Sequence, residues 1–132
     1  MNNILIQSSS RYPIRRKKIK ETVTKTLEAM QISGAVEVEI NVVGDRKMRT
    51  LKRDHLGIDE TTDVLSFPIH EKIVGEKPTF VSDPDGFIRI GTIFVSYPQA
   101  QRQANIHKLL IDDEIDQLVE HGILHLVGVH HD

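Results

Sequence analysis

The sequence of 132 residues contains no cysteine. This absence excludes disulfide bonds, thiolate zinc fingers, iron–sulfur clusters and cysteine nucleophiles, so any bound metal must be held by nitrogen or oxygen atoms. No stretch approaches the roughly 20 apolar residues that a membrane helix requires, and the first residues lack a basic region followed by a long apolar run. We therefore expect a cytoplasmic protein with no membrane partner.

Hydrophobic residues make up 39% of the sequence and charged residues 27%, close to the averages of soluble globular proteins. We expect a single domain over residues 1–132, long enough to bury a core without covalent cross-links. The 17 basic and 19 acidic side chains give a formal net charge of -2, so the overall charge does not indicate a polyanionic partner. The oligomeric state is left open by the sequence.

Apolar residues recur with two periods along the chain. Alternation or short apolar runs predict strands at Asn3–Gln7, Val36–Val42, Asp63–Phe67 and Phe87–Val95. Spacings of three and four, with Pro, Ser, Asp and Gly at the ends, predict helices from Pro13 to Gln31, Asp45 to His55, Ser96 to Ile106, and Asp112 or Asp113 to Gly128. We expect an α+β fold, with a single mixed sheet of about four strands covered by about four helices.

Three connecting positions carry further expectations. Asp45 is expected to cap the helix that follows it. Pro68 cannot donate to a ladder, so the strand before it is expected near the edge of the sheet. The segment from Glu71 to Asp85 is rich in glycine and proline, and we expect a long mobile loop whose length is typical of a lid or a binding loop.

Histidine is concentrated at the carboxyl end, where four of the seven fall in the last twelve residues. His121 and His125 are four residues apart, so a helix places both imidazoles on one face, within reach of one ion. Gly128 can end the helix and turn the chain, which would bring His131 to the same point. Three imidazoles on Zn²⁺ leave a fourth position for water, as in catalytic sites, and lower the pKa of that water to roughly 7. His130, next to His131, is expected to point away from the metal ion. We expect it either to contact a metal ligand without binding the ion or to face solvent.

The resulting pattern, H-x-x-x-H-x-x-G-x-x-H, matches an extended zinc-hydrolase signature apart from one position. Peptide-hydrolysing enzymes carry a glutamate after the first histidine, where this chain has Gly122. Glycine cannot transfer a proton, and the neighbouring Glu120 points about 100° away on a helix, so a metallopeptidase is the least favoured hypothesis. Imidazole also binds Ni²⁺ and other divalent ions, so the identity of the metal stays open.

Three blocks of the sequence resemble the YbeY family of bacterial rRNA maturation factors, which are metal-dependent endoribonucleases specific for single strands. The terminal run His121–Asp132 resembles the family signature H-G-x-L-H-L-x-G-x-D-H. Thr62–Pro68 (T-D-V-L-S-F-P) matches a second hallmark, and Ile90–Ser96 resembles a third. Residues before Thr62 resemble the family only in their order of strands and helices.

The resemblance implies that His121, His125 and His131 bind one metal ion, usually zinc. It implies a role in processing the 3′ end of 16S rRNA and in ribosome quality control, with single-stranded rRNA and the small ribosomal subunit as partners. It also implies that the Asp63–Phe67 strand borders the cleft, where Ser66 or the exposed backbone would contact substrate.

The chain departs from the family pattern at several positions. Leu56 stands where the family generally has an arginine thought to act on the phosphate, Thr92 replaces an acid in the third block, and His130 replaces an aspartate. Arg53, one helical turn before Leu56, is the nearest replacement for the missing catalytic arginine. The departures also support a second hypothesis, a ribosome-associated RNA-binding factor with a structural metal and reduced or lost nuclease activity. Family members usually continue with an acidic helix, whereas this sequence stops at Asp132, and its last residues are expected to fray.

Two groups of basic residues can follow a phosphate backbone. Arg46, Arg49 and Arg53 form one stripe on the second predicted helix, so Arg46 and Arg49 are candidate substrate-binding residues. The start of the first predicted helix carries Arg15, Arg16, Lys17, Lys18 and Lys20. A solvated helix face is the alternative for both groups. With four Phe, two Tyr and no Trp, RNA recognition is expected to depend on phosphates and shape.

Overall fold

Alternating apolar residues build the central strand of the structure. In β2 (Ala35–Val43), every second side chain from Val36 to Val42 is buried, and the residues between them are only partly covered. The strand therefore presents one face to the core, as its period of two predicts. This computed structural model describes residues 2–32, 34–69, 72–74, 77–79 and 86–128.

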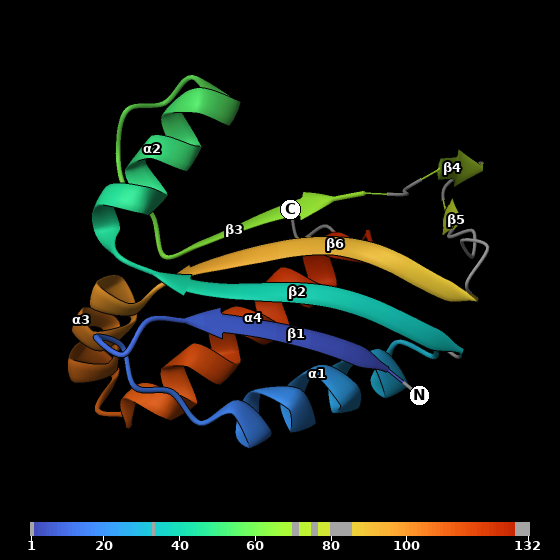
Figure 1. The fold of residues 1–132 in the computed structure, drawn as a ribbon, viewed down its shortest axis with the longest axis horizontal. Coiled ribbons are helices and arrows are strands. Elements are labelled where there is room, and N and C mark those ends of the chain that lie inside the picture. The colour runs from blue at the N-terminus through green and yellow to red at the C-terminus, as the bar shows by residue number, and fades with distance from the viewer. Residues whose placement is uncertain (1, 33, 70–71, 75–76, 80–85, 129–132) are drawn as a thin grey trace.

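Among the described residues, the main sheet has four strands in the order β1-β2-β6-β3 (Figure 1). Their bounds are β1 Asn3–Ser8, β2 Ala35–Val43, β3 Val64–Pro68 and β6 Phe87–Ser96. The first three strands in spatial order run parallel, and β3 pairs antiparallel with β6. The predicted mixed four-stranded sheet is confirmed, and β3 lies at its edge as Pro68 predicted.

In the described part of the chain, four helices complete the α+β fold: α1 Arg16–Ala29, α2 Asp45–Leu56, α3 Tyr97–His107 and α4 Ile111–Leu126. The helices α1 and α4 pack together on one face of the sheet, with α4 against β6 and β3 (Figure 1). Helix α3 packs on α4 at the end of the sheet where β6 ends, and α2 rises separately at the β3 side. The buried face of α4 carries Ile115, Leu118, Val119, Gly122, Ile123 and Leu126. Spacings of three and four thus turn one face of α4 to the core and leave the other exposed. No helix in the described part of the chain is long and apolar enough to cross a membrane.

A β-bulge interrupts β6 at Gly91. Arg89 pairs with Glu37 and Gly91 with Val38, so Ile90 is an extra residue between them. The backbone of Gly91 has a φ of 144°, and a Cβ atom there would lie 2.3 Å from the carbonyl oxygen of Phe67. Glycine is therefore required for both the conformation and the close approach of β3.

Two local expectations were wrong. Asp45 is the first residue of α2 rather than its cap, since Gly44 occupies the N-cap position. The stretch expected to be a long mobile loop contains two short paired strands, β4 (Lys72–Val74) and β5 (Lys77–Thr79). The remaining positions of that stretch lie outside the described residues.

The Asp45 carboxylate joins three separate elements. It accepts hydrogen bonds from Ser96 Oγ (2.8 Å), Thr61 Oγ1 (3.2 Å) and Arg102 Nη1 (2.9 Å). Partial burial alone would raise the pKa of Asp45, but the hydrogen bonds from Arg102 and Ser96 outweigh it and hold the pKa below the ordinary value of 3.8. The network ties the start of α2 to the junction of β6 and α3, because Ser96 also caps α3 by accepting from Gln99 N–H.

Asp45→Asn is expected to lower the free energy of unfolding at neutral pH by about 1–2 kcal/mol, because hydrogen bonds to a charged carboxylate are lost. Since folding lowers the pKa, the carboxylate contributes stability above the unfolded value of 3.8 and loses it as the pH falls through the folded-state value. Urea unfolding of both proteins at neutral and acidic pH measures this difference. A difference that stays constant in acid would count against the network.

Candidate active site

His121 and His125 lie one turn apart on the exposed side of α4, as their spacing predicted. Their ring centroids are 4.7 Å apart, and the two Nε2 atoms approach to 3.0 Å. Two imidazole lone pairs at this distance repel each other unless a proton or a cation lies between them. The pair therefore places two nitrogen atoms that can bind a cation close together at the surface.

The donor set fits a divalent metal ion. Two nitrogens bound to one tetrahedral zinc ion at about 2.0–2.1 Å lie about 3.3 Å apart, so the observed separation needs only a small adjustment. The pair also lies near the carboxyl end of α4, where the helix dipole favours a cation. Over the described ranges no group of three His, Asp or Glu side chains gathers around one point. His131, the predicted third ligand, and His130 lie outside those ranges.

Gly122, between the two histidines, explains how α4 sits against the sheet. A Cβ atom at this position would lie 2.9 Å from Ile93 Cγ2, so the absent side chain lets the helix approach β6 closely. Position 122 is buried against the sheet, whereas His121 and His125 are exposed. Gly122 itself has no side chain that could transfer a proton at the histidine pair.

Ser66 links the edge strand to the same turn of α4. Its hydroxyl group donates to the carbonyl oxygen of Gly122 at 3.3 Å. Ser96 N–H donates to Asp63 C=O on the β6 side of the strand, and the alternation of an antiparallel ladder then directs the backbone groups of Ser66 toward the outer edge. In the described part of the chain no strand pairs with that edge. The substrate-binding role of Ser66 stays a prediction. In the structure, its hydroxyl group is hydrogen-bonded to α4.

The three predicted arginines on α2 differ in their partners. Arg49 forms a two-pronged ion pair with Asp59 (2.8 and 3.1 Å), which raises the pKa of Arg49 and lowers that of Asp59. Arg53 Nε lies 3.3 Å from Asp54 Oδ1. Arg46 and Arg49 line a hollow of about 440 Å³ together with acidic residues that include Asp59. The stripe exists, but neighbouring carboxylates offset part of its positive charge.

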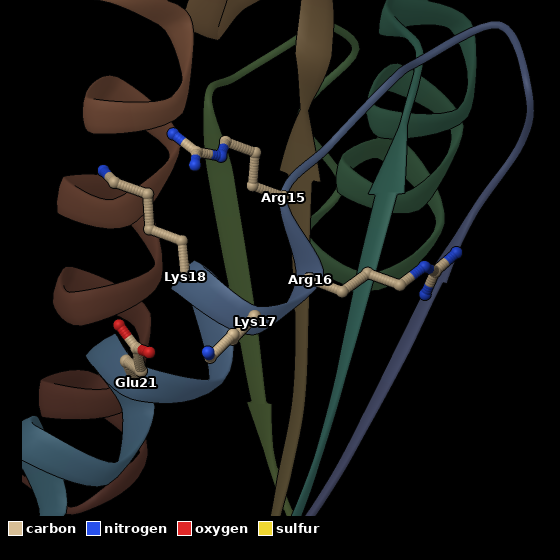
Figure 2. Close-up of a pocket in the computed structure, with 5 residues that line it drawn as sticks. All are labelled: Arg15, Arg16, Lys17, Lys18 and Glu21. Atoms are coloured by element: carbon tan, nitrogen blue, oxygen red, sulfur yellow. The ribbon is translucent and has the colours of Figure 1, made fainter.

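The basic residues at the start of α1 line a pocket of about 540 Å³ (Figure 2). Lys18 reaches α4 and binds Asp113 (2.6 Å) and Asp116 (2.5 Å), and these hydrogen bonds raise its pKa. Arg16 points the other way and donates to the carbonyl oxygen of Ile6. Two of these basic residues, Arg16 and Lys18, therefore have structural contacts that the sequence did not reveal.

One contact near the site was missed by sequence reasoning. The ring of His55, at the end of α2, packs on Phe67 of β3 with centroids 4.9 Å apart. Phe67 in turn meets Phe94 edge to face at 5.8 Å. No local pattern in the sequence signalled this contact, because His55 and Phe67 lie in different elements.

These features define an α+β domain that carries an exposed His-x-x-x-His pair on a helix next to the edge strand of its sheet. The chain belongs to the Endoribonuclease YbeY family, whose family model matches residues 5–132. Endoribonucleases are hydrolases that act on RNA, and the resemblance seen in the sequence is confirmed.

Relatives with the name Endoribonuclease YbeY cover most of the chain. The protein of Persephonella marina is 39% identical over 134 residues, covering 100% of this chain and 80% of the relative. The protein of Moorella thermoacetica is 35% identical over 125 residues (92% and 78%), and one from Dehalococcoides mccartyi is 32% identical over 132 residues (98% and 77%). The solution structure of a Thermotoga maritima protein matches the fold with a TM-score of 0.57 at 24% identity, covering 100% of this chain and 75% of that protein.

Proposed function

We propose that this chain is a metal-dependent endoribonuclease that cleaves single-stranded rRNA during maturation of the 3′ end of 16S rRNA and in ribosome quality control. It would act in the cytoplasm on the small ribosomal subunit. The observation that carries the proposal is the convergence of His121 and His125 at 3.0 Å on α4, in a chain whose family is named for RNA cleavage. The names of the relatives favour this enzyme over an RNA-binding factor that has lost nuclease activity.

His121, His125 and His131 would hold the ion, with zinc as the first candidate and Ni²⁺ or another divalent ion as alternatives. A bound ion would supply a Lewis acid for the phosphodiester and lower the pKa of a nucleophile. Gly122 supplies no general base, and the attacking group would be either water or the RNA 2′-hydroxyl group. Arg53 would stabilise the charge that develops on the phosphate, and Arg46, Arg49 and Ser66 would position the strand.

The proposal is tested by comparing cleavage of a single-stranded RNA carrying the 3′ end of 16S rRNA with cleavage of the same RNA annealed to its complement. We expect the single strand to be cut and the duplex to resist. Equal cleavage of the two forms would refute the proposed substrate, and no cleavage of either in metal-loaded protein would refute the activity.

Arg53 and Arg46 are expected to affect different kinetic parameters. Arg53→Ala should lower kcat by about tenfold to a hundredfold, because a group that stabilises charge in the transition state is lost. Arg46→Ala should mainly raise KM and reduce the slope of log affinity against log salt by about one, because one phosphate contact is lost. Steady-state kinetics at several salt concentrations separate the two. If Arg53→Ala changed only KM, a catalytic role for Arg53 would be ruled out.

A further inference from the structure

A row of aromatic rings crosses the face of β3 that points away from α4. His55 is exposed and lies on Phe67, which is half-buried and contacts Phe94. Two of the four phenylalanines in the chain thus belong to one contact row that ends in a solvent-exposed imidazole. The exposed ring at the end of this row offers a surface on which a nucleobase can stack.

Exposed aliphatic side chains follow His55 and Phe67 closely in the sequence. Leu56 is 55% exposed, Ile58 44% and Ile69 53%, and they follow the end of α2 and the end of β3. Large apolar side chains at these two ends face water in the described structure. The phenylalanines of the aromatic row and these exposed apolar side chains are uncharged, whereas most other exposed side chains of α2 are charged.

Consecutive residues of β3 connect this surface to the histidine pair. The side chain of Ser66 bonds to Gly122, which lies between His121 and His125, whereas the side chain of Phe67 lies under His55 on the opposite face. Successive side chains of a strand point to opposite faces. A strand of RNA that crosses the outer edge of β3 would therefore meet imidazoles on one side and rings on the other.

We propose that the base platform, formed by His55, Leu56 and Phe67, stacks an unpaired nucleobase of the RNA next to the phosphate at the histidine pair. This inference rests on the proposed function. Stacking is tolerant of sequence because every base has a π-face, but it requires a base that is not already stacked in a duplex. The platform would thereby select single strands, which arginine contacts to phosphates alone do not.

The test measures binding by fluorescence anisotropy with a labelled single-stranded RNA and with copies in which one base at a time is removed. We expect His55→Ala to weaken binding about fivefold or more. His55→Phe, which keeps a ring, should bind like the unchanged protein. Leu110→Ala, which truncates a leucine that is 72% exposed at the start of α4, is the matched control and should have no effect.

Coupling, a non-additive effect of His55→Ala and of removing one base, identifies the base that stacks on His55. One abasic site should weaken binding of the unchanged protein by a similar factor and have little further effect in His55→Ala. Equal abasic penalties in both proteins, or unchanged affinity in His55→Ala, would overturn the platform. Cleavage without this coupling refutes the platform alone, whereas coupling without cleavage in metal-loaded protein refutes the proposed activity and supports the platform.

Discussion

His125→Ala is expected to abolish both metal binding and RNA cleavage, with the rate falling about a thousandfold or more. The reason is geometric, since its Nε2 atom lies 3.0 Å from that of His121 and no other described side chain takes its place. His125 is exposed on α4, so its truncation removes a donor without opening the core. Metal content per chain and the rate of single-strand cleavage are the two measurements.

Glu120→Gln is the matched control for this variant. Glu120 is exposed on the same helix and next to His121, but it lies outside the proposed ligand set. We expect the control to keep its metal and its rate. Cleavage at the full rate by His125→Ala would remove the histidine pair from the chemistry, and loss of activity in Glu120→Gln would reopen a role for a carboxylate base.

Gly91→Ala is expected to be the most destabilising single-methyl change, at about 3–5 kcal/mol. The added Cβ atom would lie 2.3 Å from the carbonyl oxygen of Phe67 and 2.8 Å from Leu126 Cδ2. The φ of 144° adds backbone strain for any residue with a side chain. Because the obstacle is backbone, β3 would have to move away from β6, and with it the edge that borders the histidine pair. Denaturant unfolding of the purified variant measures the loss.

Gly57→Ala separates the two contributions at Gly91. Gly57 also has a positive φ of 72°, but a Cβ atom there meets nothing within 4 Å. We expect a cost of about 1 kcal/mol from conformation alone. If both variants lost the same stability, the close approach of β3 would contribute nothing, and the bulge would not be required by packing.

The fold was largely predictable because its elements carry a clear period. Val36 to Val42 alternate strictly, and the buried face of α4 repeats at three and four residues, so local pattern and tertiary burial agree. In the sequence, a glycine inside a predicted strand was the only sign of the bulge at Gly91. The bulge also changes the spacing of the buried residues, because Ile90 and Ile93 are three positions apart rather than two. Its cause, the carbonyl oxygen of Phe67, is distant in sequence.

The candidate site was predictable to the extent that one helix builds it. The spacing of His121 and His125 is local, so the sequence sufficed to bring them together. Ion pairs between distant residues gave no such signal. Asp45 accepts hydrogen bonds from Ser96 and Arg102, and Lys18 donates hydrogen bonds to Asp113 and Asp116. Tertiary packing brings these partners together, and no short-range sequence pattern encodes them.

Metal analysis of the purified protein, combined with cleavage of single-stranded rRNA before and after chelation, tests the central claim most directly. We predict one divalent ion per chain, loss of cleavage when the chelator removes it, and recovery when the ion is restored. The account would be contradicted by metal-free protein that cleaves the RNA at the full rate.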